Sequence, residues 1–299
     1  MRAAPLLLVL VVLVTACKPD LDERESSIES PRILAIVSEP PEARPGEAVQ
    51  YTAVVATREG PELGAPIQWA YCATPKLLTE NGSVSPECTR EGVRPLAASG
   101  PRITAPTLPD ACALFGPDVP PGGFRPRDAD GTGGYYQPLR ASWAGLTAFA
   151  RQRVTCNLAN APADVTLEFR RRYMVNKNPR LGELSARVGG EPRALDHLPL
   201  GRDVEFTVAW PPEDAESYVS VDPATQSIVP RREAMRVSWY ATAGTFATDR
   251  TGRTEAELDT FTNNVWSIET AAPRIHLWVV LRDSRGGSAY AVTTLSVNP

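Results

Sequence analysis

The heptapeptide Gly201-Arg-Asp-Val-Glu-Phe-Thr207 repeats the pattern of Gly46-Glu-Ala-Val-Gln-Tyr-Thr52. In each, a turn glycine is followed by apolar residues that alternate with polar ones, the two-residue period of a half-buried β-strand. A strand that carries a tryptophan follows each heptapeptide, at Trp69 and at Trp239. The glycine-to-tryptophan interval is 23 residues in the first copy and 38 in the second. We therefore expect two copies of one β fold, with a hairpin-sized insertion at residues 211–234.

The end of the chain predicts two more strands. Residues 276–281 are apolar on both faces, which is typical of a strand buried on both sides. Asp283-Ser-Arg-Gly-Gly287 predicts a turn, and residues 289–297 a returning terminal strand. With the Pro-Gly-Glu turn and the tryptophan strand, these features resemble the immunoglobulin-like (Ig-like) sandwiches of bacterial extracellular proteins. The resemblance implies an all-β fold of two tandem Ig-like β-sandwiches, at residues 32–177 and 178–299.

The first copy is interrupted by Pro- and Gly-rich sequence at residues 73–134. Long structureless segments are uncommon in compact domains unless they are functional or cross-linked, so we expect a long disulfide-stapled insertion here. The sandwich is expected to resume at Tyr135. Alternating apolar residues at 165–169 predict a late strand, and Arg170-Arg-Arg172 at its end would point to opposite faces rather than form one basic patch.

Four cysteines are available for disulfides, and an even number in an exported chain indicates two bonds. Three pairings are possible; we favour Cys72 with Cys88 and Cys112 with Cys156. A zinc site is the alternative, but it would want CxxC spacing or neighbouring histidines, and the sequence has neither.

The N-terminus predicts export. One arginine precedes nine unbroken apolar residues, Leu6 to Val14, about half the ~20 needed to span a bilayer, so residues 1–16 are expected to be a signal peptide. The ending Val14-Thr15-Ala16-Cys17 resembles the bacterial lipobox. That resemblance implies that Cys17 becomes the lipid-acylated first residue of the mature protein.

Residues 17–31 are expected to be this lipidated cysteine and a flexible tether, because they are polar, acidic and without apolar periodicity. The membrane is thus an expected partner through the lipid anchor. Lys18 follows the cysteine where inner-membrane lipoproteins of enteric bacteria commonly carry aspartate. By that resemblance, the outer membrane is favoured over the inner membrane.

Composition narrows the function. A net charge of −4 argues against a nucleic-acid partner. No GxSxG, HExxH or P-loop motif occurs, and two histidines leave little scope for acid–base chemistry near neutral pH, so we expect no enzyme and no cofactor. Two alternatives remain open: an envelope hydrolase with a carboxylate site in residues 73–134, and a solute-binding protein, which would need helices.

Two local patterns invite a ligand. Asp128, Asp130 and Thr132 have the alternate oxygens of a calcium loop, but its twelfth position is Leu139 instead of glutamate, so a plain turn is favoured over this weak calcium candidate. Trp143 and Trp266 have polar or small neighbours, which makes them candidate surface aromatics for glycan binding.

The combined expectation is a lipid-anchored protein of the cell envelope that presents two Ig-like modules to a protein or glycan partner without catalysis. Loops at the free end of a sandwich are the usual binding surface. The 73–134 insertion is therefore the expected contact region.

Overall fold

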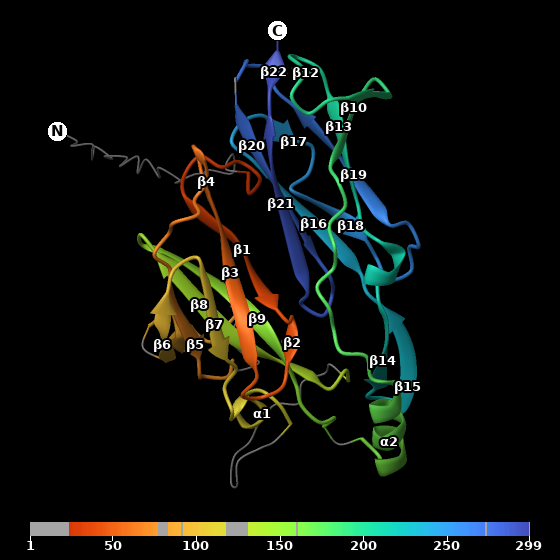
Figure 1. Cartoon of the computed structure of the whole chain (residues 1–299). Coiled ribbons are helices and arrows are strands. Elements are labelled where there is room, and N and C mark those ends of the chain that lie inside the picture. The colour runs from red at the N-terminus through yellow and green to blue at the C-terminus, as the bar shows by residue number, and fades with distance from the viewer. Residues whose placement is uncertain are drawn as a thin grey trace, which may run out of the picture.

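The computed structural model describes residues 24–76, 83–90, 92–117, 131–159, 161–272 and 274–298 of the chain. Within them the chain forms two β-sandwiches that lie side by side (Figure 1). The predicted all-β fold of tandem Ig-like sandwiches is confirmed. The predicted signal peptide and Cys17 lie outside the described residues.

The first sandwich has two sheets. One joins β1 (Arg32–Glu39), β3 (Ala48–Thr57), β4 (Gly60–Pro61) and β7 (Arg102–Pro106), with β1 at its edge. The other runs in the order β2 (Glu42–Ala43), β9 (Leu146–Thr155), β8 (Gly134–Trp143), β5 (Gln68–Cys72) and β6 (Val93–Ser99). Trp69 and Tyr71 project from β5 into a core that they share with Tyr51 of β3.

The second sandwich repeats this plan. One sheet runs β11 (Glu191–Arg193), β10 (Ser185–Val188), β13 (Val204–Ala209), β19 (Phe261–Ser267) and β17 (Thr245–Phe246). The other runs β18 (Arg250–Arg253), β16 (Met235–Ala241), β20 (Ile275–Arg282) and β21 (Ser288–Leu295). Short strands β12 (Leu198–Pro199) and β22 (Val297–Asn298) pair in parallel. The predicted strands at 204–207, 237–239 and 276–281 lie within these sheets, and the predicted terminal strand at 289–297 is divided between β21 and β22.

The insertion expected in the second copy is a β-hairpin of β14 (Ser217–Asp222) and β15 (Ser227–Arg232), preceded by a short 3-10 helix at Pro212–Asp214. The first copy differs more from expectation. Residues 73–134 include β6 and β7, one strand for each sheet, so part of the expected insertion belongs to the sandwich itself. The sequence of residues 73–134 does not predict these strands, because proline is rare within strands and β6 and β7 contain Pro95 and Pro106.

The predicted strand at 165–169 is wrong, because these residues lie in helix α2 (Ala163–Arg172). Pro162 precedes the helix, Asp164 is in its first turn, and three arginines occupy its last turn, all arrangements that suit a helix and its dipole. Val165 and Phe169 are four residues apart, so they share a helical face and pack on the β14–β15 hairpin. Leu167, the residue that created the apparent alternation, is exposed.

The prediction of a flexible tether through residue 31 is wrong for residues 24–31. Ile28 is fully buried, and its backbone nitrogen donates to the Ala241 carbonyl oxygen at 2.9 Å. The Ala241 nitrogen in turn donates to the carbonyl oxygen of Ser26, which fastens the segment to the end of β16. One apolar side chain in a polar stretch gives no periodic signal, although here it enters a buried cluster.

Trp266, expected as a candidate surface aromatic, is fully buried in the core of the second sandwich. Its neighbours on β19 are the exposed Val265 and the partly exposed Ser267, and its indole nitrogen donates to the Ala243 carbonyl oxygen at 3.2 Å. Trp143 is partly buried against the first core. The predicted aromatic glycan platform is therefore absent at Trp266.

The structure pairs Cys72 with Cys88 and Cys112 with Cys156. Cys72 ends β5 and Cys88 lies in a 3-10 helix at Pro86–Thr89. Cys112 lies in the short helix α1 (Ala111–Leu114) and Cys156 follows β9, so the second bond ties a loop to a sheet strand. Each bond thus ties a part of residues 73–134 that is not a sandwich strand to a sheet, the first at the end of β5 and the second just after β9.

Removal of the Cys112–Cys156 bond by a double alanine substitution is expected to cost roughly 2 to 4 kcal/mol, and somewhat more than removal of Cys72–Cys88. The reason is loop length, because the two bonds close separations of 44 and 16 residues. Urea unfolding of both variants measures the difference. Equal losses would show that effects other than chain entropy dominate.

Candidate functional site

The two sandwiches contact each other through the outer faces of two sheets. On β20, Ile275, Leu277, Val279 and Leu281 face the core of their own sandwich. The alternate residues Trp278 and Val280 face the first sandwich and are fully buried there. The second apolar face of residues 276–281 is therefore explained by the neighbouring domain.

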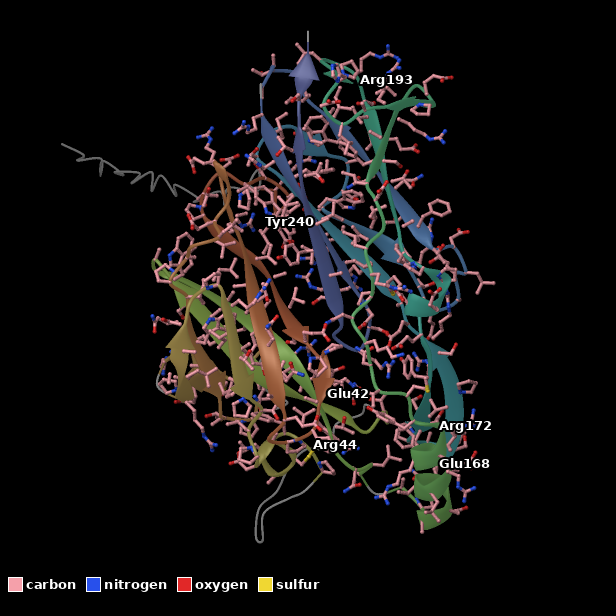
Figure 2. The ribbon with its side chains drawn as sticks, in the orientation of Figure 1. Glu42, Arg44, Glu168, Arg172, Arg193 and Tyr240 are labelled. Atoms are coloured by element: carbon pink, nitrogen blue, oxygen red, sulfur yellow. A yellow bond between two sulfur atoms is a disulfide. The ribbon has the colours of Figure 1, made fainter. Side chains whose placement is uncertain are left out.

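The apolar junction draws on four strands and the N-terminal segment. Its buried members are Ile28, Leu34, Ala35, Val54, Ala56, Tyr240, Trp278 and Val280. Figure 2 shows Tyr240 between the two sandwiches. Because fully buried aromatic and aliphatic side chains each contribute about 1.5 to 3 kcal/mol, this cluster holds the two sheets face to face.

Farther along the junction the contact becomes polar, around Glu42 of β2. Its carboxylate lies 3.2 Å from Arg153 Nε, and both side chains are completely buried. Thr155 Oγ1 donates to Glu42 at 2.8 Å. The linker between the two sandwiches follows helix α2 and leads to β10, and two of its residues also donate to Glu42. Tyr173 does so through its hydroxyl, and Asn176 through its backbone nitrogen at 2.9 Å. Figure 2 labels Glu42 on the side of the first sandwich that faces the linker.

These contacts set the charge state of Glu42. Burial alone would raise the pKa of the carboxyl, but the charge of Arg153 and the hydrogen bonds from Tyr173, Asn176 and Thr155 outweigh it and leave the pKa lowered. Glu42 is therefore an ionised, buried carboxylate. It connects the first sandwich to the linker that leads to the second.

The turn at 283–287 receives the other side of the linker. Asp283 Oδ1 accepts hydrogen bonds from the backbone nitrogens of Arg285, Gly286 and Gly287 at 2.7 to 2.9 Å. The amide of Asn176 lies 3.3 Å from the same carboxylate. Burial, and then the neighbouring charge of Glu233, raises the pKa of Asp283 to about 7. A Cβ at Gly287 would lie 2.1 Å from Asp283 Oδ2, so only glycine fits here.

Arg285 completes this polar junction. Its guanidinium pairs with Glu233 and, at 3.0 Å, with Glu216, and it donates to the Met174 carbonyl oxygen at 2.7 Å. It also lies over the Tyr218 ring, 4.4 Å from the centroid. Linker, turn and hairpin insertion are thus joined by one buried cation. The two sandwiches and their linker are cross-connected by apolar packing and by paired charges.

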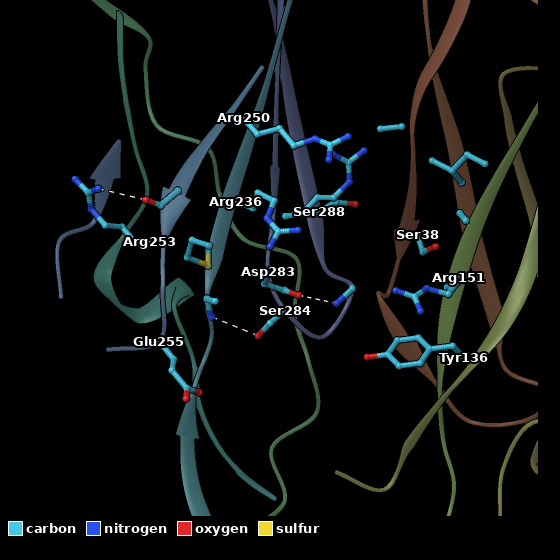
Figure 3. A pocket seen from close by; sticks show the side chains of 18 of the residues that line it. Ser38, Tyr136, Arg151, Arg236, Arg250, Arg253, Glu255, Asp283, Ser284 and Ser288 are labelled. Carbon is cyan, nitrogen blue, oxygen red and sulfur yellow. Dashed lines mark hydrogen bonds between the residues drawn. The ribbon is translucent and has the colours of Figure 1, made fainter. Parts of the chain in front are cut away.

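Between the apolar and polar contacts the junction opens into a cleft of about 950 Å³. Strands β1 and β9 of the first sandwich form one wall, and β16, β18 and the start of β21 form the other. Seven lining residues are arginines and three carry carboxyl groups. Figure 3 shows Arg236 and Arg250 directed from the second sandwich into this space, with Arg151 opposite them.

Some of these arginines have acidic partners. Arg231 pairs with Glu255 at 2.7 Å, and Arg250 pairs with Glu25 of the N-terminal segment at 2.5 Å. Arg253 lies 3.9 Å from Glu257. These pairs are solvent-exposed or partly so, and such pairs contribute little to stability.

Arg236 and Arg282 pair with no carboxylate of any described residue. Arg282 donates to the Leu34 carbonyl oxygen at 3.1 Å and lies 3.4 Å from Ser238 Oγ. Burial lowers the pKa of Arg282, and the charges of Arg250 and Arg236 act in the same direction, while Tyr240 acts against them. The cleft therefore carries uncompensated positive charge in a protein whose net charge is −4.

The site residues predicted from sequence lie elsewhere or outside the described residues. Asp128 and Asp130 are not described, and Thr132 Oγ1 accepts a hydrogen bond from Arg153 at 2.8 Å. In the described part of the chain, no group of three or more His, Cys, Asp or Glu could hold a metal ion. Nor does any helix there have the length and apolarity to cross a membrane.

The comparisons with known proteins give distant likenesses of fold. No protein-family model matches the chain, and no curated protein sequence matches it. The adhesin InvE of Yersinia pseudotuberculosis aligns at 10% identity over 87% of this chain, which spans 58% of that structure, with a TM-score of 0.22. The tandem Ig repeats of Dlar align at 11% identity over 90% of this chain and 98% of that chain, with a TM-score of 0.24.

Domains 4 and 5 of the S-layer protein SbsC align at 8% identity over 84% of this chain and 82% of that chain, with a TM-score of 0.21. At these scores the likenesses assign neither a family nor a function. The class of the protein follows from its own architecture. Two antiparallel β-sandwiches with a similar arrangement of strands are joined by one linker. This chain is a tandem Ig-like β-sandwich protein.

Proposed function

We propose that this chain is a lipid-anchored protein of the cell envelope that binds a partner without catalysis, and that the interdomain cleft is its binding surface. The observation that carries this proposal is the cleft itself. Two sandwiches held in one arrangement by buried contacts enclose a space of about 950 Å³ with excess positive charge. Preorganised surfaces bind more tightly because little conformational freedom is lost on binding.

Placement in the envelope, with the outer membrane favoured, rests on the lipobox resemblance at Cys17. A protein or glycan partner within the envelope fits this placement. None of the described residues of the 73–134 segment, which is the contact region expected from sequence, lines the cleft. The proposed binding surface is therefore the interdomain cleft and not the end of the first sandwich.

Site-specific photo-cross-linking in cells tests the proposal. A photoreactive residue at Arg253, in the cleft, is expected to yield an adduct with a partner of defined mass. The same residue at Arg193, an exposed position of β11 that Figure 2 shows away from the cleft, serves as the matched control. Adducts from Arg193 alone, or identical adducts from both positions, would contradict the cleft as the binding surface.

A further inference from the structure

Arg236 and Arg282 are direct cross-strand neighbours, paired in the register of β16 with β20. Directly opposed residues of an antiparallel pair lie on the same face with their Cβ atoms about 5 Å apart, and like charges there are destabilising. Both lie on the outer face, because Val237 and Leu281, the next pair in the register, face the core of the second sandwich. The structure thus places two like charges at directly opposed positions of the sheet.

Three serines lie on strands next to this pair or across the cleft from it. Ser238 is two residues from Arg236 on the same face of β16, and Ser288 of β21 lies directly opposite Arg282. Ser38 of β1 lines the cleft from the first sandwich. Arg250 lies opposite Ser238 on β18, where Glu25 already balances its charge. The arrangement therefore has two positive charges that no carboxylate of a described residue balances, with serines at neighbouring register positions and across the cleft.

We propose that Arg236 and Arg282 bind a dianionic oxyanion of the phosphate class, carried by a ligand that enters the interdomain cleft. Guanidinium groups present paired N–H donors that match the oxygens of such a group, and two of them balance its two charges. The serine hydroxyls supply further donors. This inference rests on the proposed function, since it names the chemistry that the cleft recognises.

A role in preventing aggregation does not account for the pair. Charged residues commonly protect exposed edge strands, and Arg250 and Arg253 on the edge strand β18 fit that role. Arg236 and Arg282 lie on strands that are paired on both sides. Their strands need no such protection, so a bound anion is the better account of their pairing.

The test uses the full mature protein in nonionic detergent with inorganic phosphate as the probe. Binding is measured by calorimetric titration at constant ionic strength, set with chloride. Arg236→Gln is expected to weaken phosphate binding at least tenfold, because one charged fork is lost. In chloride alone, the same variant is expected to unfold at a higher temperature than the wild type, because the repulsion of Arg282 is relieved.

Arg193→Gln is the matched control, with the same change of charge on an exposed strand outside the cleft. It should bind phosphate as the wild type does. Arg282→Gln should lose binding as Arg236→Gln does, but it also loses the contact with Leu34 and so should not unfold at a higher temperature. Equal phosphate affinity in wild type and Arg236→Gln would overturn the proposed site.

Competition distinguishes the source of the phosphate group. Displacement of the probe by mixed micelles of the same detergent with phosphatidic acid supports a lipid-borne phosphate, and failure of these micelles to compete supports a soluble phosphate ester. Displacement by polyglutamate at equal charge would overturn the phosphate class in favour of an acidic peptide. If photo-cross-linking at Arg253 captures a partner but phosphate binding does not depend on Arg236, then the proposed function stands and only the phosphate site is rejected.

Discussion

Replacement of Glu42 by glutamine is expected to lower the free energy of unfolding by roughly 3 to 5 kcal/mol. The substitution keeps the shape of the side chain and removes only its charge. Arg153, completely buried 3.2 Å away, then has a buried positive charge whose paired carboxylate is gone. The cost of that desolvated charge, rather than the worth of a surface ion pair, sets the size of the effect.

The Glu42→Gln substitution should also weaken hydrogen bonds to the linker. Tyr173 and the backbone nitrogen of Asn176 donate to the Glu42 carboxylate, and a glutamine amide offers one oxygen where the carboxylate offers two. The linker contacts of the first sandwich should therefore weaken, and hydrogen exchange at residues 173–176 should become faster. Urea unfolding measures the free energy, and mass spectrometry measures the exchange.

Glu213→Gln provides the matched control. Its carboxylate pairs with Arg180 at 2.5 Å, but both side chains are more than half exposed. An exposed pair is worth about 1 kcal/mol or less, so this variant should unfold close to the wild type. Similar losses for Glu42→Gln and Glu213→Gln would contradict a special role for the buried pair.

The difference in stability between wild type and Glu42→Gln should depend on pH in a defined direction. The pKa of Glu42 is lowered from its ordinary value of 4.5, so its ionisation stabilises the folded state above that value. This contribution is lost as the pH falls below 4.5 through the lowered pKa. The stability difference between wild type and Glu42→Gln should therefore be largest near neutral pH and shrink in acid.

Much of the fold follows from sequence because a sandwich core leaves a local, periodic trace. The Gly-to-Trp repeat located the strands of both cores, and Trp69 and Trp239 are buried where the repeat places them. The sequence of helix α2 has the pattern of a strand because its apolar residues fit two periods at once, with Val165 and Phe169 four residues apart on one helical face and Leu167 exposed between them. Short amphipathic segments are open to this ambiguity.

The cleft could not be predicted in the same way. Its walls come from β1 and β9 in one sandwich and β16 and β18 in the other, so it exists only once the junction fixes their relative position. One signal was present in the sequence, because the second apolar face of residues 276–281 requires a neighbour. The pairing of Arg236 with Arg282 depends on strand register across 46 residues, which local periodicity does not specify.

The association of Cys17 with lipid is expected to have the largest effect of all. Two or three acyl chains bury dozens of methylene groups at about 0.8 kcal/mol each, far beyond the marginal hold of one chain, so the wild-type protein should stay on membranes in high salt. Cys17→Ser should block lipidation and normal signal cleavage. Both sandwiches should still fold, because their described contacts begin at Arg24.

Metabolic labelling with a palmitate analogue, followed by a high-salt wash of the membranes, measures the effect. The other four cysteines are paired in disulfides, so their thiols cannot carry the label in the folded protein, and incorporated label reports on Cys17. The matched control is Ser26→Ala, which changes a nearby residue without touching the lipobox. If the wild-type protein takes no label, or washes from the membrane as Cys17→Ser does, then Val14-Thr15-Ala16-Cys17 is a chance match and the anchor must be abandoned.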